Sequence, residues 1–159
     1  MTEDLHVHLQ NHWTAATGGV DFARRVARSH HGTAVGVALA EVAAQVADDR
    51  ESLRQIMEQL GVQPARLVPL AARLVERLGR LKPNGHLIRR SPVSDVLELE
   101  ALRGAVTAKG AGWDTLTVLA ETDDRLPREW LIQLAERARE QAASLTTIQR
   151  EVAAALSRG

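Results

Sequence analysis

The sequence contains no cysteine and no tyrosine, and only one Phe and three Trp among its 159 residues. Without cysteine the chain has no disulfides, no thiolate metal ligands and no cysteine nucleophile. This is consistent with a reducing compartment, and we expect the protein to be cytoplasmic. Aromatic and β-branched residues favour strands, whereas Ala, Leu, Arg and Glu, which dominate here, favour helices. The composition therefore predicts an all-α protein.

The sequence also lacks net charge, with twenty basic and twenty acidic residues. Balanced charge gives no overall field that would attract nucleic acid or a membrane surface. No segment approaches the ~20 consecutive apolar residues of a membrane span. The first residues, Met1 to Asp4, are polar and acidic, unlike the basic and then apolar start of a signal peptide. We expect no membrane association.

Apolar residues recur at helical spacing in five segments, separated by glycine, proline and serine at positions typical of helix ends. Gly61 is a typical C-terminal stop, and Ser91 followed by Pro92 is a typical helix start. The length suits one ordinary domain. We predict a single domain, residues 1–159, with helices at about 5–30, 33–60, 69–82, 91–120 and 125–156.

The connection between the second and fourth segments decides the topology. A helix over 33–60 would be about 42 Å long, at 1.5 Å per residue. Within the connection, twelve helical residues and eight extended residues would add roughly 18 Å and roughly 26 Å. The chain could then return to the end of the bundle where the second helix began. We predict two antiparallel hairpins joined by a long crossover with a short extra helix; the rival is a five-helix bundle.

This pattern resembles the ferritin-like superfamily, as do the segments Gly79 to Gly85 and Arg89 to Pro92. The resemblance implies a ferritin-like four-helix bundle, in a bacterial branch without the di-iron ligands. Metal-binding members use Glu-x-x-His motifs on two helices and a glutamate on each of the others. Here that motif occurs once, from Glu3 to His6, at a helix tip. We therefore predict no cofactor and no iron chemistry.

Four polar residues interrupt the apolar seams of the four long helices. They are His12, Asp49, Lys109 and Gln141, one on each helix. With a crossover topology, all four fall within about one turn of the bundle midpoint. The sequence therefore predicts a mid-bundle polar layer, with Asp49 and Lys109 as a buried ion pair. The pair could fix helix register, replace a lost metal or bind a small ligand; alternatively, the side chains point outward.

Glycines inside the predicted helices suggest close helix contacts or room for a ligand. Gly19 and Gly104 map to similar heights beside the predicted polar layer. Each interior glycine costs about 1 kcal/mol relative to alanine. A small mid-bundle cavity is one explanation, and close packing is the other.

Two further groups could bind ligands. His8 and His12 lie one helical turn apart, with Asp4 a turn before His8, so the three are candidate metal ligands. The alternative is a surface stripe. The connection 73–90 is locally basic, and its candidate anion-binding residues are Arg80, Lys82, Arg89 and Arg90. It lacks interleaved aromatics, so we do not expect nucleic-acid binding through base stacking.

Three functions follow as hypotheses. The first is a non-catalytic bundle that acts through a protein partner or a homodimer. The second is a metal or small-ligand site at the polar layer formed by His12, Asp49, Lys109 and Gln141. The third is anion or nucleic-acid binding through residues 73–90.

Overall fold

The computed structural model describes residues 3–65, 92–154 and 156. They form four long helices: α1 (Glu3–Ser29), α2 (Ala34–Gln59), α4 (Pro92–Leu119) and α5 (Arg128–Ala154). No strand occurs in this part of the chain. The prediction of an all-helical bundle is confirmed for the described residues. The predicted short helix at 69–82 and the proposed serine cap at Ser91 lie outside them.

Local sequence explains how the first hairpin turns. The Thr33 hydroxyl accepts a hydrogen bond from the Gly36 amide at 3.0 Å, so Thr33 caps the start of α2. Gly32 has φ 81° in the turn before it. A Cβ at Gly36 would lie 2.1 Å from the carbonyl oxygen of His30, so only glycine fits there. Gly61, which the sequence predicts as a C-terminal helix stop, follows the end of α2 and has φ 71°.

The start of α5 differs from the prediction. The predicted helix began at about residue 125, whereas α5 begins at Arg128. Asp123 accepts hydrogen bonds from the backbone and guanidinium of Arg125, which holds a turn at 120–127. The Leu126 side chain is buried beneath that turn. The helix therefore starts after Pro127.

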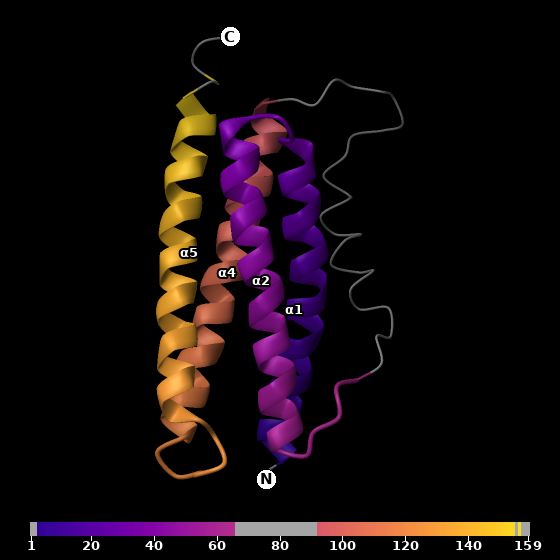
Figure 1. The fold of residues 1–159 in the computed structure, drawn as a ribbon, viewed down its shortest axis with the longest axis vertical. Coiled ribbons are helices and arrows are strands. Elements are labelled where there is room, and N and C mark those ends of the chain that lie inside the picture. Colours follow the sequence, from indigo (N-terminus) through magenta and orange to yellow (C-terminus); the bar gives the residue numbers. More distant parts are fainter. Residues whose placement is uncertain (1–2, 66–91, 155, 157–159) are drawn as a thin grey trace.

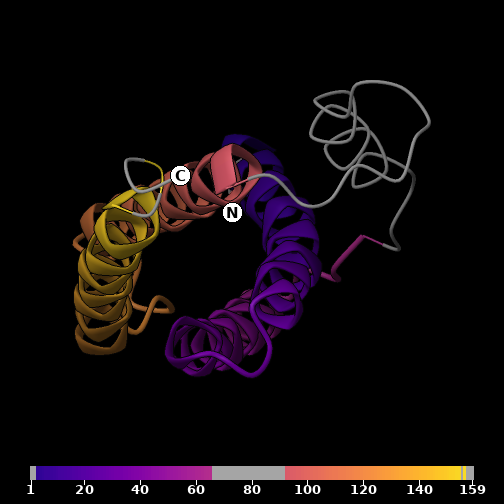
Figure 2. The ribbon, with the colours of Figure 1, turned by 90° about the horizontal axis from the view of Figure 1, so that it is seen from above.

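Paired contacts show how the helices run. Glu100 and Gln149 bond near one end of α4 and α5, and Asp114 bonds to Arg139 farther along. The residue numbers rise on α4 as they fall on α5, so these two helices run in opposite directions. Figure 1 shows α2 and α4 descending and α1 and α5 ascending. Seen from above, α1 lies beside α4 and α2 faces α5 (Figure 2).

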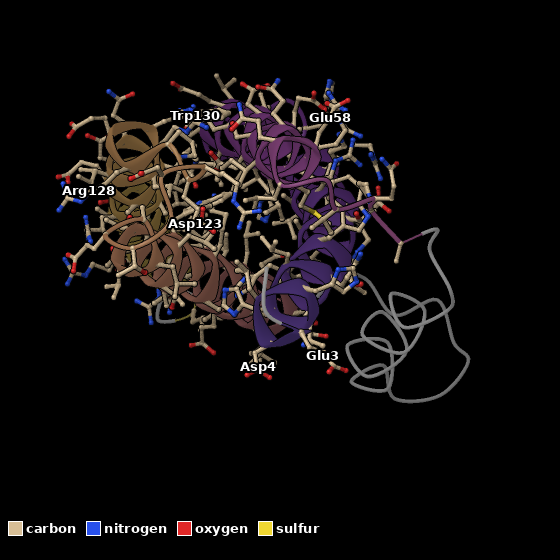
Figure 3. All side chains as sticks on the ribbon, turned by 90° about the horizontal axis from the view of Figure 1, so that it is seen from below. Glu3, Asp4, Glu58, Asp123, Arg128 and Trp130 are labelled. Atoms are coloured by element: carbon tan, nitrogen blue, oxygen red, sulfur yellow. The ribbon has the colours of Figure 1, made fainter. Side chains whose placement is uncertain are left out.

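The buried side chains form two apolar clusters, one in each half of the bundle. The lower cluster contains Leu9 and Leu53, and the upper cluster contains Val26 and Leu145. All four helices contribute to both clusters. At the lower end, Glu3, Asp4, Glu58 and Arg128 point outward into solvent (Figure 3). The two clusters separate at mid-height, and the polar residues described next lie there.

Candidate functional site

Asp49 is the centre of a buried polar network. It is 1% exposed, although it carries a charge, and Gln141 is equally buried. Lys109 Nζ donates to Asp49 Oδ2 and to Gln141 Oε1, and Gln141 Nε2 donates to Asp49 Oδ2 at 3.0 Å. The structure thus brings together three of the four residues predicted to form a polar layer, from α2, α4 and α5.

A fourth member of this network was missed by the sequence reasoning. Arg137 Nε donates to Asp49 Oδ1 at 2.7 Å, and its Nη2 donates to the same oxygen. Arg137 lies one turn before Gln141 on α5, and its side chain is 35% exposed. The four-residue spacing from Gln141 was a signal for it, because residues one turn apart share a helix face. Its long side chain reaches inward from the edge of that face.

The network contains more positive than negative charge. Asp49 pairs with two cations, Lys109 and Arg137, and its side chain is fully buried. Burial lowers the pKa of Lys109, and the neighbouring Asp49 carboxylate partly offsets this effect. The Arg137 charge lowers the same pKa further. One carboxylate therefore balances only one of the two cations.

A cavity of about 360 Å³ lies beside the network, between α1, α2 and α4. This volume is in the range of small-molecule sites, which are concave and mostly apolar with a few polar groups. Asp49 and Lys109 form part of its wall. The apolar part of the wall includes Phe22, Val46, Leu102 and Val106.

Small residues make room for the cavity where α1 faces α4. Gly19 lines it, and a Cβ there would meet nothing within 4 Å. Exposed alanines, Ala15 on α1 and Ala105 and Ala108 on α4, also border it and mark where it meets the surface. Gly104, which the sequence places at a similar height to Gly19, is exposed and does not line the cavity.

His12, the fourth predicted layer residue, lies in the cavity wall rather than in the hydrogen-bonded network. A Cβ at Gly112 would lie 2.4 Å from His12 Cε1, so the glycine lets the imidazole pack against α4. The rings of His8 and His12 are 4.5 Å apart between centroids. Burial lowers the pKa of both histidines, and for His12 the neighbouring His8 lowers it further.

The predicted metal ligands do not form a three-residue group. Within residues 3–65 and 92–154, no three His, Asp or Glu side chains are placed to hold a metal ion. His8 and His12 are adjacent, whereas Asp4 is exposed; Asp4 and His8 both border a second hollow at the lower end, which His12 does not line. Stable metal sites usually supply three or four protein ligands.

Three nitrogen atoms in the cavity-lining residues are buried and have no hydrogen-bond partner among the described residues. They are Arg50 Nε, Trp113 Nε1 and His8 Nε2. Trp113 is 3% exposed, and its indole nitrogen can only donate. The Arg50 guanidinium lies over the Trp13 ring, 5.8 Å from its centroid. Buried polar atoms are normally paired. These three come from α1, α2 and α4 and are closed off from the cavity space as well as from solvent, so they do not mark a ligand site.

The predicted anion-binding residues Arg80, Lys82, Arg89 and Arg90 lie outside the described residues. None of the four described helices combines the length and apolar character needed to cross a lipid bilayer. Comparison with protein-family models, curated proteins and solved structures gave no match. The functional interpretation therefore depends on the residues of this chain alone.

Proposed function

We propose that the protein is a non-catalytic binding protein that holds a small, largely apolar molecule inside its helical bundle. The observation that carries the proposal is the cavity of about 360 Å³ between α1, α2 and α4. Its apolar wall favours an apolar ligand, since removing apolar surface from water stabilises a complex. Asp49 and Lys109, two members of the buried network, form one side of it.

Filling the cavity tests this proposal. Gly19→Leu places a side chain where Gly19 faces open space in the cavity wall. Gly104→Leu is the matched control, because its Cβ also meets nothing but lies outside the cavity. We expect octan-1-ol to bind the native protein and Gly104→Leu, and to bind Gly19→Leu at least tenfold more weakly, by isothermal titration calorimetry. Absence of binding to the native protein, or equal binding to both variants, would refute the proposal.

We also propose that the bundle is ferritin-like. The support is that α2 and α4 run in the same direction, so α2 ends at one end of the bundle and α4 begins at the other (Figure 1). Because the chain has no cysteine, introduced cysteines can carry spin labels at chosen sites. Labels at Glu58 and Val93 should lie about 40 Å apart, at 1.5 Å per residue. Labels at Glu58 and Thr122 should be much closer, and equal distances would reject the topology.

Association with a protein partner or a second copy stays a prediction. The exposed large apolar side chains are spread over all four helices and both ends of the bundle. They are Val7, Val37, Val93, Leu97, Val118, Ile132 and Leu156. Single exposed apolar residues are normal on protein surfaces and do not mark an interface. The cavity therefore carries the proposed function.

A further inference from the structure

The cavity lies along the line where α1 faces α4, and two contacts set the register of these antiparallel helices (Figure 1). At the lower contact, His12 packs against Gly112. At the upper contact, Arg25 Nη1 donates to Glu98 Oε1 at 2.7 Å. The contacts are thirteen residues apart on α1 and fourteen apart on α4, which is roughly 20 Å of each helix. The two helices therefore run side by side at matched heights over this length.

Between these two contacts the facing residues are small. The register places Ala16 on α1 at the height of Ala108 on α4, and one turn higher it places Gly19 at the height of Ala105. All four line the cavity. None of them has an atom beyond Cβ, and a Cβ added at Gly19 would meet nothing within 4 Å. Since Ala105 and Ala108 are exposed, the cavity opens to solvent along this side.

The cavity is long and narrow. Its lining extends over about four turns of α1, from His8 to Phe22, and about four turns of α4, from Ala101 to Leu116. A volume of about 360 Å³ spread over roughly 21 Å of helix leaves a narrow cross-section. An unbranched chain matches such a space, whereas a compact ring system needs a wider one.

We infer that the ligand is a long, unbranched aliphatic chain that lies parallel to α1 and α4. The inference rests on the proposed function and adds the shape and chemical class of the ligand. Both ends of the cavity are apolar, with Leu9 at the lower end and Phe22 at the upper end, so methylene groups are buried along its whole length. Asp49 and Lys109 in the wall bond to each other, and an apolar chain leaves this bond intact. Because the stabilisation grows with the apolar area removed from water, a longer chain binds more tightly until the cavity is full.

Alcohols of different length and shape test the inference. The affinity should rise about fourfold for each methylene group from hexan-1-ol through octan-1-ol and decan-1-ol to dodecan-1-ol, because burying one CH₂ contributes about 0.8 kcal/mol. Adamantan-1-ol has as many carbon atoms as decan-1-ol, held in a compact cage. We expect it to bind at least tenfold more weakly than decan-1-ol, since forcing a wide group into a packed interior is unfavourable. Isothermal titration calorimetry on the full chain measures the affinities.

A substitution at the upper end tests how far the chain reaches. Ala101 lines the cavity there, so Ala101→Leu shortens the available length. This variant should bind hexan-1-ol as the native protein does, whereas its affinity for dodecan-1-ol should fall toward that for decan-1-ol. Ala142→Leu is the matched control, because Ala142 packs against the same upper cluster from α5 and does not line the cavity. Circular dichroism confirms that each variant keeps its helical content.

The outcomes separate this inference from the proposed function. Equal binding of adamantan-1-ol and decan-1-ol, or an affinity that does not rise with chain length, would overturn the unbranched chain and leave the apolar binding site standing. The same dodecan-1-ol affinity in Ala101→Leu as in the native protein, or an equal loss in Ala142→Leu, would also overturn the inference. No binding of any alcohol would overturn both the inference and the proposed function.

Discussion

Lys109 on α4 donates a hydrogen bond to Asp49 on α2, across the boundary between the hairpin of α1 and α2 and the hairpin of α4 and α5. The same ammonium donates to Gln141. Both residues interrupt apolar seams, and their side chains meet where the upper and lower apolar clusters separate. Burying a charged pair costs desolvation energy. Removing one partner should therefore lower the stability of the protein, whereas replacing both partners with apolar residues should restore much of it.

Replacing only Asp49 should destabilise the protein strongly. Asp49→Ala leaves Lys109 and Arg137 close together without their carboxylate, and we expect a loss of about 3–5 kcal/mol in the free energy of unfolding. The double replacement Asp49→Leu with Lys109→Met should recover much of this loss, because the desolvation cost of the buried pair disappears with its charges. The remaining cation, Arg137, has a side chain that is 35% exposed and can turn to solvent. Denaturant unfolding measures all three proteins. A loss below about 1 kcal/mol for Asp49→Ala would mean that the pair behaves like a surface ion pair.

Three glycines in α4 should respond differently to alanine. Gly112→Ala puts a Cβ against the His12 ring and should lower the melting temperature, because His12 must move. Gly104→Ala meets open space on an exposed face and should raise stability by up to about 1 kcal/mol through helix propensity. At Gly110 the Cβ would lie 3.3 Å from that of Ala138, so we expect an intermediate effect. Equal melting temperatures for Gly112→Ala and Gly104→Ala would contradict the His12 contact.

The turn between α1 and α2 should tolerate no side chain at Gly36. A Cβ added at Gly36 would lie 2.1 Å from the backbone oxygen of His30, which cannot rotate away as a side chain can. Gly36→Ala should therefore disrupt the turn and cost more than Thr33→Ala, which removes a helix cap worth about 1 kcal/mol. Thermal unfolding of the two variants gives the comparison. If Gly36→Ala proves the milder change, the close approach of α2 to His30 is wrong.

Stability should fall as the pH drops below the ordinary histidine value of 6.5. Burial lowers the pKa of His8 and His12 in the folded protein, so the unfolded chain binds protons first. Stability therefore decreases from about pH 6.5 downward, until the folded protein also takes up these protons. Denaturant unfolding at about pH 7.5 and about pH 5.5 measures the change.

Substitution identifies the residues that cause this slope, the change of the free energy of unfolding with pH. The pair His8→Gln and His12→Gln should flatten the dependence between these two pH values, since glutamine does not titrate. His6→Gln, at an exposed position on the same helix, is the control and should leave the slope as it is. An unchanged slope in the double variant would assign the pH dependence to other groups.

Helical spacing and helix-end residues were sufficient to predict the four long helices. They were also sufficient to place Asp49, Lys109 and Gln141 at one level, because each interrupts a seam of apolar residues. Arg137 was missed because it flanks its seam and reaches inward only through a long side chain. The spacing of apolar residues indicates the direction in which each Cβ points from its helix. It does not indicate how far a long side chain reaches.

The cavity could be predicted only in part. Interior glycines suggested space, but Gly19 lines the cavity whereas Gly104 is exposed. The difference depends on how α1 and α4 are rotated against each other, and this relationship is not encoded in either helix alone. His12 likewise has the spacing of a layer residue, yet it packs on α4 at Gly112. Sequence spacing therefore gave the height of the site more reliably than its contacts.

The polar network also has a consequence for the order of folding. The hydrogen bonds to Asp49 join residues 60, 88 and 92 positions apart in the chain, whereas the hairpins close through connections of four residues (30–33) and eight residues (120–127). Contacts between distant residues require the larger loss of chain entropy and tend to form late. We therefore expect the hairpins to form first and the Asp49 network to form after the main folding barrier. Weakening the network would then accelerate unfolding and leave the rate of folding nearly unchanged.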